Sequence, residues 1–100
     1  MKGGYIMKYY YKGKLVRTSA NEYNFGLYSA NTDKVIKCSK STKALENEIA
    51  TKKKIAYGST GDIEYMKKNP DKYTAEEIEH TIKETDEYFD GLKIVKLERE

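Results

Sequence analysis

The sequence predicts an α+β domain in which two N-terminal β-hairpins and a C-terminal strand form an antiparallel sheet packed by two main helices. Runs rich in tyrosine and β-branched residues fill the first forty positions and return near the end, and apolar residues recur at helical spacing between them. One hundred residues are enough for one domain, so we expect residues 1–100 to fold as a single unit. Leu, Ile, Val and Phe supply only 18 residues, whereas tyrosine supplies 10, which predicts a partly wet, tyrosine-rich core.

The first hairpin is predicted from residues 5–11 and 14–19, which flank the dipeptide Lys12-Gly13. Glycine at the second turn position suits the positive φ of a type I′ turn. Direct pairing across this turn places Tyr9 opposite Val16 and Lys8 opposite Arg17. One face then holds Met7, Tyr9, Tyr11, Val16 and Thr18 towards the core, and the other holds Ile6, Lys8, Tyr10, Leu15 and Arg17.

A second hairpin is predicted from strands around 23–28 and 34–39, which flank the polar segment "SANTDK". Alternation along these strands predicts that Phe25 and Leu27 face inward, together with Ile36 and Cys38 on the partner strand.

Helical periodicity begins after Ser41. A first helix is predicted over 42–56, with Ser41 or Thr42 as its N-cap and Gly58 as its stop. A short helical turn is expected near 63–66. The second main helix is predicted over 75–90, because Thr74 and Glu77 match a capping box, and "LKIVKLE" after Gly91 is typical of a final strand.

Charge is distributed unevenly along the chain. Residues 1–57 carry twelve Lys/Arg against four Asp/Glu, and residues 58–100 carry seven against twelve. This pattern indicates either an anion-binding face or two halves that attract each other. Arginine occurs only twice, so nucleic-acid binding, where present, is expected to be non-specific.

Candidate catalytic and metal-binding groups are sparse. His80 shares a helix face with Glu76 and Glu84, but exposed helices commonly carry such stripes and no second histidine completes a metal site. Cys38 is expected to be a small buried residue, and the loop "GSTGD" lacks the pattern of a phosphate-binding loop. Asp86 and Asp90 are expected to face solvent. We therefore expect no enzyme activity, no cofactor and no metal.

Location is inferred from two features. A single cysteine cannot form an internal disulfide, and no signal peptide precedes the first strand, so a cytoplasmic location is expected. No apolar stretch approaches the length of a membrane span, and no membrane partner is expected.

Two surfaces are candidates for binding. Lysines that attract a phosphate backbone beside an exposed aromatic ring are typical of single-strand binders, although a solvated sheet face shows the same residue types. This basic hairpin set comprises Lys8, Tyr10, Lys12, Lys14 and Arg17. The second candidate is the outer face of the acidic helix, with Glu76, Glu79, His80, Lys83 and Glu87.

The stretches "YYYKGKLVRTSANEYNFGLYS", "KVIKCSKSTKALENEI" and "LKIVKLE" resemble small uncharacterised proteins of phages and other mobile elements of Gram-positive bacteria. The resemblance covers the first half of the chain and its last strand, and it carries no known functional residue. It implies a setting in which short proteins act stoichiometrically on host protein or nucleoprotein targets, such as a defence complex.

These observations favour a non-enzymatic interaction protein that binds and modulates or inhibits a host protein or nucleoprotein in the host cytoplasm. The excess of tyrosine supports this hypothesis, because tyrosine is enriched in binding surfaces. The alternative is a non-specific nucleic-acid-binding protein that uses the basic hairpin. A homodimer is a further way to cover leftover apolar surface.

Overall fold

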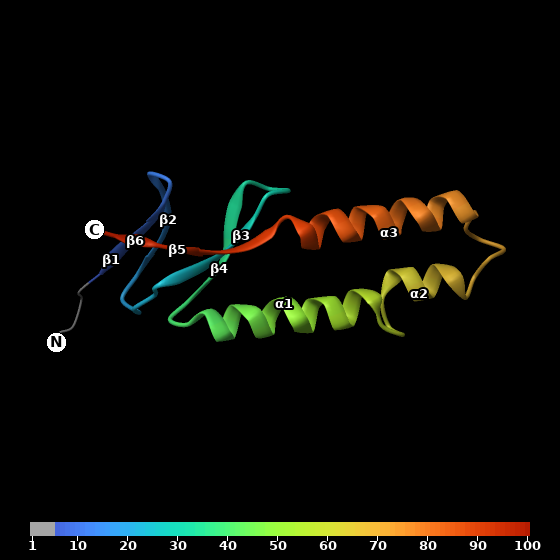
Figure 1. The fold of residues 1–100 in the computed structure, drawn as a ribbon, viewed down its shortest axis with the longest axis horizontal. Coiled ribbons are helices and arrows are strands. Elements are labelled where there is room, and N and C mark those ends of the chain that lie inside the picture. Colours follow the sequence, from blue (N-terminus) through green and yellow to red (C-terminus); the bar gives the residue numbers. More distant parts are fainter. Residues whose placement is uncertain (1–5) are drawn as a thin grey trace.

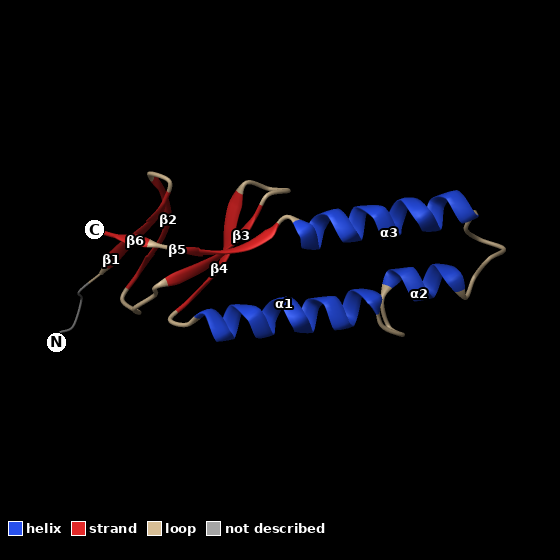
Figure 2. Ribbon diagram, in the orientation of Figure 1, coloured by secondary structure: helices blue, strands red, loops and turns tan. Residues whose placement is uncertain are grey.

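A computed structural model describes residues 6–100 and confirms the α+β class. The strands gather at one end of the molecule and the helices extend from them as an arm (Figures 1 and 2). The elements, in chain order, are β1 (Met7–Tyr11), β2 (Lys14–Ser19), β3 (Phe25–Ser29), β4 (Lys34–Ser39), α1 (Thr42–Tyr57), α2 (Asp62–Lys67), α3 (Ala75–Asp90), β5 (Leu92–Lys96) and β6 (Glu98–Arg99).

The strands form two three-stranded antiparallel sheets instead of the single predicted sheet. Their orders are β2-β1-β6 and β4-β3-β5, so each N-terminal hairpin gains its third strand from the C-terminal segment. The predicted final strand is therefore divided. Leu97 lies between its two parts, and its backbone N–H donates to Asn24 O in the loop that joins the hairpins, at 3.0 Å.

The first hairpin has the predicted turn but a different register. Lys12 and Gly13 have φ values of 50° and 78°, as a type I′ turn requires. A bulge then inserts Val16, so that Arg17 pairs with Tyr9. The predicted pairing of Lys8 with Arg17 is wrong, because the extra residue in β2 shifts every pair beyond Tyr10 by one position.

This shift also changes which residues share a face. Lys8 pairs with Thr18, which is exposed, so the predicted inward position of Thr18 is wrong. Arg17 moves to the face that carries Tyr9. The prediction for the first strand is confirmed, since Met7 and Tyr11 pack against the buried cluster of Tyr9, Val95 and Leu97.

The second hairpin repeats the pattern of the first. Its register shifts between Leu27 and Tyr28, which makes Ile36 the extra residue in β4. Leu27 is buried as predicted, but Ile36 is 42% exposed, so its predicted inward position is wrong. A bulged residue leaves the alternation of its strand, and this is the physical reason for the exposure.

The two hairpins are copies of one structural pattern. Their second strands read "KLVRTS" and "KVIKCS", with the bulge at the third position of each. Both strands end in a serine whose Oγ accepts a hydrogen bond from the backbone two residues later: Ser19 from Asn21 N at 3.0 Å and Ser39 from Ser41 N at 3.2 Å. The chain therefore builds the sheet end from a repeated unit.

The helices form an arm in which α3 runs back alongside α1 and α2 (Figure 1). Ser41 caps α1 and the predicted Thr74–Glu77 capping box is present at α3, so both main helices begin as expected. Four apolar side chains are buried along the arm: Leu45, Ile63, Met66 and Phe89. At the C-terminal end of α1, the hydroxyl of Tyr57 donates to the carboxylate of Asp86 and joins α1 to α3.

The molecule is long and thin. Its extents are 60 × 24 × 20 Å and its radius of gyration is 17.7 Å, whereas a compact chain of this length has a radius of about 13 Å. Its accessible surface is 7033 Å², compared with about 5,800 Å² for a compact protein of this mass. Much of the chain is therefore available for contact with a partner.

The charges follow this shape. Among the described residues, the sheet end (6–41 and 91–100) holds ten Lys/Arg and four Asp/Glu, and the helical arm (42–90) holds eight and twelve. The basic and acidic regions lie at opposite ends of the long axis (Figure 2).

Candidate functional site

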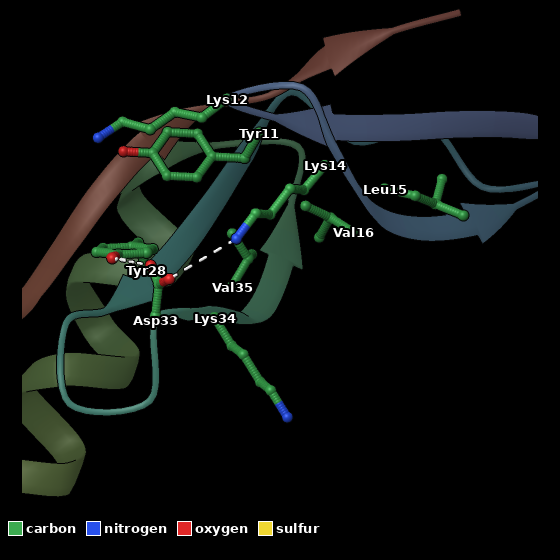
Figure 3. Close-up of a pocket in the computed structure, with 9 residues that line it drawn as sticks. All are labelled: Tyr11, Lys12, Lys14, Leu15, Val16, Tyr28, Asp33, Lys34 and Val35. Atoms are coloured by element: carbon green, nitrogen blue, oxygen red, sulfur yellow. Dashed lines mark hydrogen bonds and ion pairs between the residues drawn. The ribbon is translucent and has the colours of Figure 1, made fainter.

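The best-defined concavity lies between the turn ends of the two hairpins (Figure 3). We call it the hairpin cleft. Its volume is about 500 Å³, within the range of small-ligand sites. It is lined by Tyr11, Lys12, Lys14, Leu15, Val16, Tyr28, Asp33, Lys34 and Val35.

The repeated unit explains why lysines and apolar side chains meet in this cleft. Lys14 and Lys34 are the first residues of β2 and β4, and Leu15 and Val35 follow them in corresponding positions. Each hairpin therefore contributes a lysine and a neighbouring aliphatic residue to the lining of the same cleft. Lys14 points towards Asp33, whereas Lys34 extends outward (Figure 3). The aliphatic groups form the apolar part of the lining.

Two tyrosines form the aromatic part of the cleft. The ring centroids of Tyr11 and Tyr28 lie 5.3 Å apart at an interplanar angle of 51°. The Nζ atom of Lys12 lies 5.5 Å from the centroid of Tyr11, within cation–π range. The rings are thus held against each other, with a cation beside one of them.

One carboxylate organises the polar side of the cleft. The hydroxyl of Tyr28 donates to Asp33 Oδ1, and Lys14 Nζ lies 3.9 Å from Asp33 Oδ2. The hydrogen bond from Tyr28, and then the charge of Lys14, hold the pKa of Asp33 below its ordinary value, and the bond to Asp33 raises the pKa of Tyr28. At neutral pH the phenol of Tyr28 is therefore neutral and Asp33 is a carboxylate. The three lysines of the lining outnumber this one acid, which leaves the cleft positively charged.

The basic hairpin set predicted from the sequence does not form one surface. Lys12 and Lys14 line the hairpin cleft. Lys8 and Tyr10 instead lie near the C-terminal Glu100, with a Lys8 Nζ–Oε1 distance of 3.9 Å and a Tyr10 hydroxyl–Oε2 distance of 3.4 Å.

Arg17, the fifth member of that set, lies at another place on the sheet. Its guanidinium carbon is 5.2 Å from the ring centroid of Tyr23, which itself packs edge-on against Tyr9. Arg17 also lies near Cys38, but burial is the larger effect and raises the pKa of that thiol. Cys38 therefore stays protonated at neutral pH, as expected for a packing residue.

Tyr11, Tyr28 and Lys34 are cleft residues that the sequence interpretation missed. The signal that could have found them is the correspondence between "KLVRTS" and "KVIKCS", which places Lys34 where Lys14 stands in the first copy. Tyr11 was expected only in the core, and Tyr28 and Lys34 were expected in no site. The reason is that two hairpins of one flat sheet would not face each other across a cleft.

The acidic-helix set lies on α3 as predicted. Glu76, Glu79, His80, Lys83 and Glu87 are all exposed, and His80 Nε2 lies 3.1 Å from Glu84 Oε1. Over residues 6–100, no three His, Cys, Asp or Glu side chains are grouped so that they could hold a metal ion. None of the described helices has the length and apolar character of a membrane span.

The loop "GSTGD" connects α1 to α2. A Cβ atom at Gly61 would lie 2.3 Å from Ala56 O, so the backbone itself packs closely there. This close approach agrees with the prediction of a helix connector.

Comparisons of the chain with family models, curated proteins and solved structures return no match. Any assignment of function therefore rests on the geometry and charge of the molecule.

Proposed function

We propose that this chain is a non-enzymatic interaction protein that binds a host protein or nucleoprotein, such as a defence complex, in the host cytoplasm and modulates or inhibits it. The observation that carries the proposal is the thin body with a basic sheet end and an acidic arm. Such a body offers more surface per residue than a compact domain, and its charged ends favour oriented encounters with a partner.

The chemistry of the hairpin cleft supports binding over catalysis. The hydroxyl of Tyr28 is engaged by Asp33 and its pKa is raised, so it is poorly suited to act as a base or nucleophile. Asp33 is engaged in turn by Tyr28 and Lys14, and its lowered pKa makes it a weak base. These groups fix each other's positions, which suits a binding surface.

The proposal is tested by differential capture from a lysate of a Gram-positive host. Immobilised wild-type protein is compared with an arm variant, E79Q/E87Q, and with a matched control, E46Q/D71N, which removes the same charge elsewhere on the arm. A cleft variant, K14A/K34A, completes the set. Quantitative mass spectrometry then identifies what each protein retains.

The expected result is a protein or nucleoprotein that the wild type and the control retain at micromolar concentration. Loss of that partner from the arm variant assigns contact to α3, and loss from the cleft variant assigns it to the sheet end. If the wild-type protein retains no partner that free protein can displace, the proposal is wrong.

A further inference from the structure

We infer that the hairpin cleft binds single-stranded nucleic acid, with phosphates against Lys12, Lys14 and Lys34 and a base against the aliphatic and tyrosine lining. This inference rests on the proposed function and names the chemistry of a partner at the sheet end. The site differs from the basic hairpin set, because it requires Lys34 and Tyr28 of the second hairpin.

The lining of the cleft calls for a ligand that is both anionic and apolar. Val16 lies beside Val35 in the cleft (Figure 3), and these two side chains form its aliphatic area. Leu15, which is 57% exposed, pairs with Tyr10 and lies at the edge of the cleft.

Three lysines line the cleft against one carboxylate, that of Asp33. Lys14 points towards Asp33, and Lys12 and Lys34 extend outward from the rim (Figure 3). A purely inorganic anion would leave the aliphatic side chains uncovered, whereas a nucleotide carries a phosphate and a planar base together.

The extent of the positive charge indicates a polymer. The sheet end holds ten Lys/Arg in its described residues, and only three of them line the cleft. The excess of positive charge therefore continues beyond the space that one small ligand fills. A polyanion that crosses the cleft interacts with this wider field, and each neutralised phosphate releases counterions.

The apolar lining favours a single strand over a duplex. In a duplex the base faces are stacked on one another, whereas an unpaired base presents its face to side chains. Eight of the ten basic residues are lysines, which contact phosphates as point charges and do not read base edges in a bidentate manner. Binding is therefore expected to depend weakly on base sequence.

The test is fluorescence anisotropy with a labelled 12-nucleotide oligothymidylate, using the whole chain in 50 mM NaCl. The K14A/K34A variant removes the two corresponding lysines of the cleft. The matched control, K40A/K96A, removes two exposed lysines of the sheet end that do not line the cleft. Circular dichroism verifies that each variant is folded.

The expected affinity of K14A/K34A is at least about 10-fold weaker than that of the wild type, and the control changes by less than about 3-fold. The slope of log affinity against log salt falls in magnitude by about 1.4 in the cleft variant, since each single-strand phosphate contact contributes about 0.7. A Y11L variant retains the apolar character of the side chain but loses stacking, and is expected to bind about 5-fold or more weakly.

Four results overturn the inference. These are no binding of the oligonucleotide in 50 mM NaCl, equal losses in the cleft and control variants, equal affinity for a 12-base-pair duplex, and binding of a labelled acidic peptide in preference to the oligonucleotide. If K14A/K34A still captures the partner and the wild-type protein does not bind the oligonucleotide, this site is refuted and the proposed function stands. Oligonucleotide binding without any captured partner would refute the proposed function and leave this site standing.

Discussion

Tyr9 joins the first hairpin to the loop that leads into the second. Tyr9 is 0% exposed. Its hydroxyl donates a hydrogen bond to Asn21 O at 2.7 Å and accepts one from the backbone N–H of Tyr23 at 3.0 Å. Replacing Tyr9 by phenylalanine retains the ring and its edge-on contact with Tyr23. It removes both hydrogen bonds and the longer contact of the hydroxyl with Met7 Sδ at 3.5 Å. The variant therefore isolates the energetic contribution of one hydroxyl group.

The expected loss of stability follows from these two bonds. A typical protein hydrogen bond contributes about 1 kcal/mol, and a donor left unsatisfied in a buried site costs about 1 to 3 kcal/mol. Asn21 is exposed, so water can replace its partner, whereas Tyr23 is half-buried and its N–H donates within a partly buried hydrogen bond. We therefore expect Y9F to lower the free energy of unfolding by about 2 kcal/mol.

Urea denaturation followed by circular dichroism measures this change, and a thermal melt should show a fall in Tm of about 10 °C. The control is Y65F, which removes a hydroxyl from a tyrosine that is 52% exposed and should change stability by less than about 0.5 kcal/mol. A loss below about 0.5 kcal/mol in Y9F would show that its hydroxyl does not hold the loop.

Three further changes test other parts of the fold. G26A places a Cβ atom 2.6 Å from Val35 Cγ1, so it should destabilise the protein by about 1 to 3 kcal/mol in urea denaturation. The double variant G26A/V35A should recover part of that loss, because V35A removes the clashing methyl group. Additive losses of the two substitutions would contradict the clash. T74A removes the capping-box hydroxyl and should cost about 1 kcal/mol, with T60A in the α1–α2 loop as the neutral control. The bond to Asp86 raises the pKa of Tyr57 to about 12, so the stability that this bond contributes is present below about pH 10 and is lost as the pH rises through 12. Spectrophotometric titration of Y57F should lack this late-titrating phenol. If Y57F instead lacks a phenol that titrates near pH 10, the assignment is wrong.

The termini of the elements were predictable because each has a local chemical cause. The φ values at Lys12 and Gly13 follow from the needs of a tight hairpin turn. The capping serine and the capping box mark the starts of α1 and α3, because these side chains satisfy backbone N–H groups that the helices cannot. Such features depend on a few neighbouring residues and are visible in the sequence.

The bulges were not predictable from local sequence. Val16 and Ile36 are β-branched residues that fit a regular strand equally well, so nothing in their side chains marks them as extra. Contacts distant in sequence accompany the observed register, such as the approach of Arg17 to Cys38 in the second hairpin. Since a shift of one residue exchanges the two faces of a strand, this single feature moved Arg17 away from the predicted site.

The hairpin cleft escaped prediction for a related reason. It exists only because the hairpins belong to two sheets, and that division depends on how the C-terminal segment pairs. "LKIVKLE" has the composition of one continuous strand, yet Val95 pairs within the second sheet and Glu98 within the first. The lysines were visible in the sequence, but their grouping across the two hairpins was a tertiary property.

The shared C-terminal segment has a consequence for the order of folding. Residues 7–39 leave the ribosome early, but neither sheet gains its third strand until residues 92–99 have been made. Two-stranded hairpins are only marginally stable in water, so both wait for the same late segment. The helical arm lies between β4 and β5 in the sequence, so it sets the length of the chain segment whose two ends must meet. This loop closure is expected to limit the folding rate. Both sheets should therefore become stable in one cooperative step, and neither should persist without the other.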